Sequence, residues 1–297
     1  MKPLLLLIVF FVFACHNTVD FNLKFEKVAY GLQFPEGPAW DDQQQVLYFS
    51  NCYGNWLGIL QSDRPDTFVT VDSTQNCFRQ TNGLTFHSDG FLYACDFGLG
   101  AIERFDRNGN CQIIEAGFNR PNDLAFGKDG NLYFTDPKSY GKDKPDGKVY
   151  RYNFKIGKVE LMADSLCFPN GIAFNADWTA AYIAESAKNR ILKFELQSDG
   201  MFGKVKVFAE MPDGDPDGIA LDVKGNVYVA HFGAGQIAVF DSTGQRIASI
   251  PVPGKKPSNL EFAGPDLKTL YVTEDETNAI YKTRMPIPGL PLNFSKQ

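Results

Sequence analysis

The chain has 297 residues, of which 35 are acidic and 29 basic, and its pI is near 5.2. This balance argues against a basic surface of the kind that binds nucleic acid or an anionic membrane. Hydrophobic residues make up 44% of the sequence and aromatic residues 14%, so a disordered chain is excluded and a large core can form.

The first residues are typical of an export signal. Lys2 precedes an apolar run from Leu4 to Ala14, which is too short to span a bilayer as a helix and suits the core of a signal peptide. The stretch VFAC (12–15) resembles a bacterial lipobox, whose cysteine is lipidated; ordinary cleavage after Ala14 is the alternative. We expect a lipoprotein-type signal peptide at 1–14 and a short tether at 15–24. The protein is then exported to the periplasm or cell surface, with a lipid anchor at Cys15 as its only membrane contact.

One heptapeptide pattern recurs six times along the rest of the chain. It is written FPEGPAW (34–40), QTNGLTF (80–86), RPNDLAF (120–126), FPNGIAF (168–174), DPDGIAL (215–221) and KPSNLEF (256–262). A turn follows each copy, and then a strand with Tyr at a fixed place, such as VLYFSN (46–51) or NLYFTD (131–136). Short β-branched and aromatic runs separated by Gly and Asp turns predict an all-β chain.

The repeat predicts a six-bladed β-propeller of four-stranded antiparallel blades. Each unit of 40–48 residues holds four strand-like runs, except that the sixth lacks a fourth. The segment LKFEKVAYG (23–31) can supply the missing strand, so an N-terminal strand closes the last blade. A solenoid is the competing fold, but it requires capped ends rather than a closed ring. We therefore expect a single propeller domain over residues 25–297.

Polar residues occupy the third position of every heptapeptide, where the innermost strand of each blade begins. Six side chains are expected to point at one spot on the propeller axis: Glu36, Asn82, Asn122, Asn170, Asp217 and Ser258. The second strands end at the same mouth with a further polar set that predicts an outer ring: Asn51, Asp96, Asp136, Glu185, His231 and Glu274. Asn82, Asp136, Glu185 and His231 are kept as additional candidate site residues. The alternative is that these residues only mark the starts of turns.

The inner ring offers the ligands of a hard cation. Carboxylate, amide and hydroxyl oxygens favour one divalent ion, Ca²⁺ first and then Mg²⁺ or Mn²⁺. Zn²⁺ is a further candidate, although it normally prefers His or Cys ligands. Glu36 and Asp217 supply two negative charges that would repel each other without a cation.

These motifs, taken together and in order, resemble the regucalcin/gluconolactonase (senescence marker protein, LRE-like) family of six-bladed propellers. The residues that carry the resemblance are PEGPAW, RPNDLAF, NLYFTDPKSYG, FPNGIAF and DPDGIALD, within residues 25–285. The resemblance implies that Glu36, Asn170 and Asp217 hold one divalent cation. It places Asn122 beside the metal, where it helps to bind substrate or water, and makes Arg120 a substrate-binding residue.

The chemistry implied by the resemblance is hydrolysis of a small sugar-type lactone. A metal polarises the carbonyl and activates water, and Asp217 is the expected general base. Asp123 is expected to hold a sugar hydroxyl or to orient a ligand. His231 is a candidate proton shuttle, with a packing role as the alternative. The chain has three His and no G-x-S-x-G motif, which argues against a Ser-His-Asp hydrolase.

Two other functions fit the same framework. One is a different metal-dependent esterase or phosphotriesterase, and the other is a non-enzymatic, Ca²⁺-stabilised binding propeller. Arg120 and the mixed Glu, Asn and Asp ligands favour an enzyme, because a structural ring needs neither. The insertion DPKSYGKDKPDGK (136–148) lies beside Asn122 and carries Lys138 and Tyr140. It is expected to set lactone preference, and a passive surface loop is the alternative.

Beyond Cys15 the chain has five cysteines: Cys52, Cys77, Cys95, Cys111 and Cys167. No CxxC pair occurs, so neither a zinc ribbon nor a thioredoxin-like site is predicted. Buried free cysteines are one interpretation. A disulfide between Cys52 and either Cys77 or Cys95 is the other, because an exported protein folds in an oxidising compartment.

Overall fold

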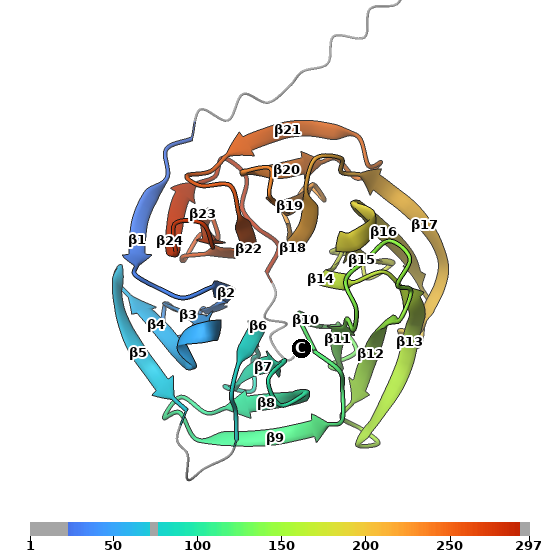
Figure 1. Cartoon of the computed structure of the whole chain (residues 1–297), viewed down its shortest axis with the longest axis horizontal. Helices are drawn as coiled ribbons and strands as arrows, with labels where there is room; N and C mark the ends of the chain where they lie inside the picture. Colours follow the sequence, from blue (N-terminus) through green and yellow to red (C-terminus); the bar gives the residue numbers. More distant parts are fainter. Residues whose placement is uncertain (1–22, 72–76, 292–297) are drawn as a thin grey trace, which may run out of the picture.

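The computed structural model describes residues 23–71 and 77–291, which form a six-bladed β-propeller (Figure 1). Six four-stranded antiparallel sheets surround a central channel, so the fold predicted from the repeat is confirmed. The predicted signal peptide, the anchor at Cys15 and most of the tether lie outside the described residues. Within the described ranges, no helix is long and apolar enough to cross a membrane.

The first three blades follow the repeat units. Blade one comprises β2 (Pro35–Asp41), β3 (Val46–Asn51), β4 (Trp56–Gln61) and β5 (Arg64–Thr70), with the 3₁₀ turn η1 (Cys52–Gly54) after β3. Blade two comprises β6 (Thr81–Phe86), β7 (Leu92–Asp96), β8 (Ala101–Phe105) and β9 (Cys111–Ala116). Blade three comprises β10 (Leu124–Phe126), β11 (Leu132–Asp136), β12 (Gly147–Asn153) and β13 (Lys158–Leu166).

The last three blades complete the ring. Blade four comprises β14 (Pro169–Phe174), β15 (Ala180–Glu185), β16 (Arg190–Leu196) and β17 (Phe202–Glu210), with η2 (Ser186–Lys188) after β15. Blade five comprises β18 (Asp215–Leu221), β19 (Val227–Phe232), β20 (Gln236–Phe240) and β21 (Arg246–Pro251). Blade six joins β22 (Pro257–Ala263), β23 (Thr269–Glu274) and β24 (Ala279–Arg284) to the N-terminal strand β1 (Glu26–Tyr30), in the order β1-β24-β23-β22. The predicted closure by an N-terminal strand is therefore confirmed.

The repeated tyrosine of the second strands fills the space between blades. Tyr48, Tyr93, Tyr133, Tyr182 and Tyr228 are each at most 2% exposed. Their rings meet other aromatic rings edge to face; Tyr48 and Phe68, for example, have centroids 4.9 Å apart. Such pairs add to the large apolar area that each aromatic side chain buries, so these positions hold neighbouring sheets together.

Glycine at the fourth heptapeptide position lets the inner strands approach closely. Gly37 has a φ of +51°, and a Cβ placed on it would lie 2.3 Å from the carbonyl oxygen of Asn82. A side chain would therefore push blade one away from blade two. The strand pairing shifts register between Glu36 and Ala39, which is typical of a β-bulge that re-aims a side chain.

Buried hydroxyl groups tie several inner strands to the blade before them. Ser50 Oγ donates to the carbonyl oxygen of Asn82 (2.6 Å), and Thr135 Oγ1 donates to that of Asn170 (2.8 Å). Ser186 Oγ donates to the carbonyl of Pro216 in the same way (2.6 Å). These bonds set the relative positions of the third heptapeptide residues.

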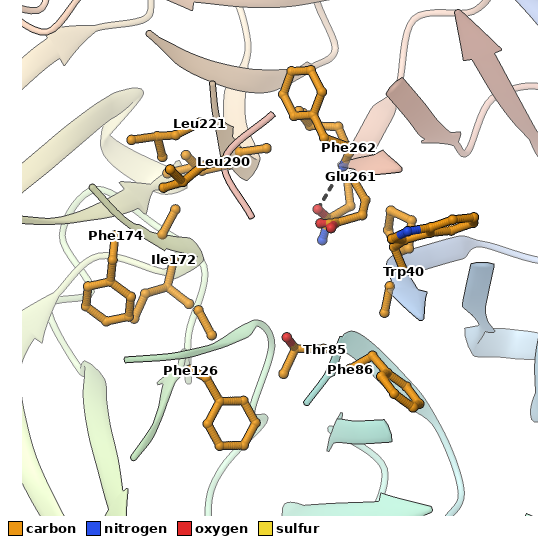
Figure 2. Close-up of a pocket in the computed structure, with 18 of the residues that line it drawn as sticks. Trp40, Thr85, Phe86, Phe126, Ile172, Phe174, Leu221, Glu261, Phe262 and Leu290 are labelled. Carbon is orange, nitrogen blue, oxygen red and sulfur yellow. Dashed lines mark hydrogen bonds between the residues drawn. The ribbon is translucent and has the colours of Figure 1, made fainter. Parts of the chain in front are cut away.

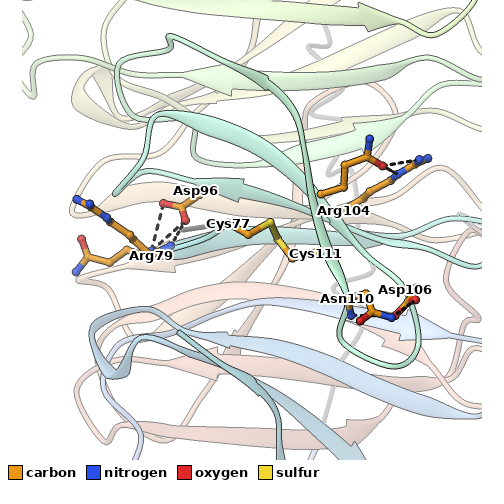
Figure 3. Close-up of a disulfide and its surroundings, with 9 residues drawn as sticks. Cys77, Arg79, Asp96, Arg104, Asp106, Asn110 and Cys111 are labelled. Carbon is orange, nitrogen blue, oxygen red and sulfur yellow. Dashed lines mark hydrogen bonds between the residues drawn. A yellow bond between two sulfur atoms is a disulfide. The ribbon is translucent and has the colours of Figure 1, made fainter. Parts of the chain in front are cut away.

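Cys77 and Cys111 form a disulfide within blade two (Figure 3). It ties the segment before β6 to the outermost strand β9, with the two Cα atoms 6.0 Å apart, a separation that suits a disulfide. The predicted pairing of Cys52 with Cys77 or Cys95 is wrong. Cys52 and Cys95 are buried and free, because η1 and β7 carry them into the interior, away from the blade edge where Cys77 lies.

Candidate functional site

A pocket opens at the mouth of the channel where the inner strands begin. Five of the six predicted inner-ring side chains line it: Glu36, Asn82, Asn122, Asn170 and Asp217. They come from blades one to five, and each stands at or just before the start of an inner strand. The sequence therefore predicted which residues converge here.

Ser258 is the exception. It is fully buried, and its hydroxyl donates to the carbonyl of Pro35 (3.0 Å), so it joins blade six to blade one and does not line the pocket. Its neighbour Asn259 does not line the pocket either, but it contacts the ring, because Asn259 Nδ2 donates to Glu36 Oε2 (3.2 Å). Asn259 stands where four other copies of the pattern have Gly. That departure was a signal which the sequence interpretation missed.

The two acidic residues of the ring are buried close to each other. Burial, and then the nearby Asp123 carboxylate, raises the pKa of Glu36 to about 7 against the lowering effect of the Gly37 amide. Burial first, and then the charge of Glu36, raises the pKa of Asp217 well above its ordinary value. Two carboxylates placed together in this way disfavour their charged forms unless a positive charge lies between them.

Several oxygens of the ring lack a protein partner. Asn82 Oδ1 is buried and accepts no hydrogen bond. In the described part of the chain, the Asp217 carboxylate and the side chains of Asn122 and Asn170 make no hydrogen bond either. Buried polar atoms are normally paired, and each exception calls for an explanation such as an ion or water. The donor set therefore fits a cation that takes amide and carboxylate oxygens.

The chemistry of this donor set favours a hard cation. Among the described residues, no group of three or more His, Cys, Asp or Glu side chains converges in a way that could hold a metal. The pocket instead combines two carboxylates with amide oxygens from Asn82, Asn122 and Asn170. Mixed oxygen ligands of this kind suit Ca²⁺ better than Zn²⁺.

Asp123 does not line this pocket, and its expected role, to hold a sugar hydroxyl or to orient a ligand, stays a prediction. Its two carboxylate oxygens accept backbone hydrogen bonds from Leu124 (2.9 Å) and Ile172 (3.3 Å). It lines a different cavity further along the channel. The bond from Ile172 joins Asp123, at the start of the inner strand of blade three, to the inner strand of blade four.

The cavity at the far end of the channel is mainly apolar (Figure 2). Side chains such as Phe86, Phe126 and Phe174 surround it, and Leu290 of the C-terminal segment lies across it. Glu261 is the acidic side chain that Figure 2 labels there. The ring oxygens that lack a protein hydrogen-bond partner thus lie at the end of the channel opposite to this apolar cavity.

The predicted outer ring does not line the pocket. Asp136 accepts a hydrogen bond from the backbone N–H of Arg120 (2.7 Å), and Glu185 accepts one from that of Cys167 (2.8 Å). These side chains hold the segments that lead into the inner strands, so their candidacy as pocket residues is corrected. His231 is also buried outside the pocket lining, and burial lowers its pKa, which corresponds to the packing alternative.

Arg120 remains free to meet a ligand. It is exposed at the pocket wall, and its guanidinium carbon lies 5.8 Å from the ring centroid of Phe97. Within the described ranges it forms no salt bridge, and in particular none with Asp123. The predicted substrate-binding role of Arg120 stays a prediction.

An aromatic wall surrounds the polar floor, and the sequence interpretation missed it. We define this aromatic wall as Phe34, Tyr53, Phe97, Phe168 and Phe232, all of which line the pocket. Phe34 and Phe168 occupy the first heptapeptide position and have φ values of +59° and +58°, which is strained for bulky residues. Tyr53 and Phe97 follow the ends of β3 and β7 by two residues and by one, and Phe232 is the last residue of β19. That regular placement was an available signal.

Comparisons with known proteins agree with the propeller fold. Residues 34–275 match the family model described as the SMP-30/Gluconolactonase/LRE-like region. A gluconolactonase from Zymomonas mobilis is 29% identical, with 90% of this chain and 83% of the relative covered. The solved structure of a gluconolactonase from Xanthomonas campestris has a TM-score of 0.78 and 28% identity, covering 89% of this chain and 90% of that one. A calcium-binding protein, regucalcin, from Agrobacterium tumefaciens shares the fold, with a TM-score of 0.80, 22% identity and coverage of 93% and 98%.

Proposed function

The chain belongs to the SMP-30/gluconolactonase/LRE-like family, and from this premise we propose that it hydrolyses a small sugar-type lactone with the help of one divalent cation. The observation that supports this most is the convergence of Glu36, Asn122, Asn170 and Asp217 on one pocket, with most of their oxygens unpaired. Ca²⁺ is the first candidate, before Mg²⁺, Mn²⁺ and Zn²⁺.

Glu36, Asn170 and Asp217 are the proposed metal ligands, with Asn122 beside them. A divalent cation supplies Lewis-acid polarisation of the lactone carbonyl and makes nearby water more acidic. Removal of Glu36 or Asp217 takes away one of the two charges that balance the cation, and removal of Asn170 takes away a neutral oxygen ligand. Metal affinity and activity are therefore expected to fall together.

The side chains around the floor perform the remaining steps. Asp217 accepts a proton from the attacking water, a role that fits a carboxylate free of protein hydrogen bonds. Arg120 offers a planar pair of donors to lactone oxygens or to the carboxylate released on ring opening. The aromatic wall packs against the C–H face of the lactone and excludes water from the side of the floor.

The proposal is tested by stripping the protein of metal with a chelator and restoring one cation at a time. Hydrolysis of δ-gluconolactone, a simple alkyl lactone and a phosphotriester is then measured at neutral pH. We expect lactone hydrolysis that depends on the added cation. Phosphotriester turnover above lactone turnover favours another metal hydrolase, and cation binding without any turnover favours a binding propeller.

We also propose that the protein is exported and anchored by a lipid at Cys15. The apolar run before VFAC supports this, as does the Cys77–Cys111 disulfide, because disulfides persist in oxidising compartments. Incorporation of labelled fatty acid into the wild type and not into Cys15→Ser tests it. Equal labelling of the two proteins, or none in either, contradicts the anchor.

A further inference from the structure

The loop between β11 and β12 leaves blade three and runs beside blade four (Figure 1). Residues 137–146 form it, and two contacts hold it, one near its base and one at its middle. The backbone N–H of Ser139 donates to Asp146 Oδ1 (3.0 Å), and Cys167 Sγ donates to the carbonyl of Lys142 (3.3 Å). The loop is thus held near its base by Asp146 and at its middle by Cys167, and Tyr140, between these two contacts, lines the pocket.

Tyr140 of the loop contacts blade five. Its hydroxyl donates to Asp215 Oδ2 (2.8 Å), and its ring lies 5.3 Å from that of Phe168, centroid to centroid. Asp215 is held from its other side by Asn189 Nδ2 (3.0 Å). Tyr140, Phe168 and Asp215 line the same pocket as Asn170, so the contact runs from the loop of blade three to blade five at the pocket wall.

The hydrogen bond between Tyr140 and Asp215 can break at low cost. Tyr140 remains 59% exposed, so little apolar area is lost when it moves away. A hydrogen bond from a phenol to a carboxylate is directional, and at an exposed site water replaces it at modest cost. Phe168, by contrast, is fixed by the start of β14 and offers a rigid surface for the ring to return to.

We propose that the Tyr140–Asp215 hydrogen bond is a clasp that closes the pocket above blade four, and that Tyr140 is a specificity-determining residue which disfavours lactones with a bulky substituent on that side. The substrate class that follows is a compact monocyclic lactone whose face packs on the aromatic wall. This substrate claim rests on the proposed lactonase function, whereas the clasp itself does not.

The test compares Tyr140→Phe, which keeps the ring and removes the donor, with the wild type. Tyr30→Phe is the matched control, because Tyr30 is an exposed tyrosine of β1 on blade six, and its hydroxyl makes no hydrogen bond to the described residues. Two readouts are measured. The first is the rate of tryptic cleavage after the loop lysines Lys138 and Lys142, since Lys144 precedes Pro145 and is not a tryptic site. The second is kcat/KM for a compact lactone and for one with a long alkyl chain.

We expect Tyr140→Phe to raise loop cleavage about fivefold, and to raise the ratio of long-chain to compact kcat/KM about fivefold through KM, as the loss of one exposed charge-assisted bond implies. Asp215→Ala should reproduce both effects, and the double variant should add less than about twofold to either. Tyr30→Phe should match the wild type in both readouts.

The outcomes separate the clasp from the function. Unchanged loop cleavage in Tyr140→Phe overturns the clasp, whatever the enzyme does. Faster cleavage with an unchanged substrate ratio overturns the specificity role of Tyr140. If the wild type hydrolyses no lactone with any cation, the proposed function fails and the substrate claim falls with it, while the cleavage rates still decide the clasp.

Discussion

Glu103 places a carboxyl group without hydrogen bonds inside blade two. The residue lies in the middle of β8, it is fully buried, and neither carboxylate oxygen has a hydrogen-bond partner. Burial, and then the neighbouring Asp96 carboxylate, raises the pKa of Glu103 from 4.5 to about 10. At neutral pH the folded protein therefore holds a proton that the unfolded chain releases.

The sign and the size of the effect follow from proton linkage. A raised carboxyl pKa means that the folded state binds more protons than the unfolded state above pH 4.5, so stability falls as pH rises towards 10. Each proton released on unfolding lowers the free energy of unfolding by about 1.4 kcal/mol per pH unit. Between pH 5 and pH 8 the free energy of unfolding should therefore fall by about 4 kcal/mol. Glu103→Gln is close in shape and cannot ionise, so it should lack this loss.

Urea denaturation followed by tryptophan fluorescence measures this difference. Curves are recorded at pH 5 and pH 8. The free energy of unfolding of Glu103→Gln, relative to that of the wild type, should be about 4 kcal/mol higher at pH 8 than at pH 5. Glu115→Gln, on β9 of the same blade, is the control for the loss of a partly exposed charge. If wild type and Glu103→Gln change in parallel to within about 1 kcal/mol, the reasoning about Glu103 is refuted.

Three further changes have defined outcomes. Replacing Cys77 and Cys111 with Ser removes a cross-link over a separation of 34 residues, so the free energy of unfolding measured with urea should fall by about 4 kcal/mol. A fall of less than about 1 kcal/mol contradicts this. Arg120→Lys keeps the charge and loses the planar fork, so KM for a polyhydroxylated lactone should rise several-fold more than KM for an alkyl lactone. If Arg120→Lys lowers the Tm and raises KM equally for both lactones, Arg120 does not recognise the substrate. Gly37→Ala puts a Cβ against the Asn82 carbonyl, so calorimetry should show weaker cation binding by more than about tenfold; wild-type affinity refutes the close-approach argument.

The sequence predicted the parts of the structure that repeat. Six copies of one pattern set the number of blades and placed Glu36 and Asp217 at one mouth, because equivalent positions in equivalent blades face the same axis. It did not predict where single residues depart from the pattern. Ser258 keeps its repeat position, yet its hydroxyl donates to the carbonyl of Pro35 in blade one. Asp123 stands where four other copies have Gly, and its carboxylate accepts a backbone hydrogen bond from Ile172 of blade four.

Features that depend on contacts between units were also beyond the sequence. The Cys77–Cys111 pairing depends on how the segment before β6 lies against the edge strand, which no spacing rule gives. The bond from Tyr140 to Asp215 joins residues 75 positions apart across an intervening blade. The sequence showed the loop as an insertion, but not that its Tyr140 contacts Asp215.

The central claim is that this pocket binds one divalent cation and uses it to open a lactone. The most direct measurement is the initial rate of lactone hydrolysis by chelator-treated protein as Ca²⁺ is added back, for the wild type, Glu36→Gln and the control Asp42→Asn at the far end of the channel. The account predicts that one equivalent of cation restores the rate of the wild type and the control. Glu36→Gln should remain more than about 100-fold slower at the same cation concentration, because a direct ligand is lost. An undiminished wild-type rate in excess chelator, or a Glu36→Gln rate equal to the wild type, contradicts the account.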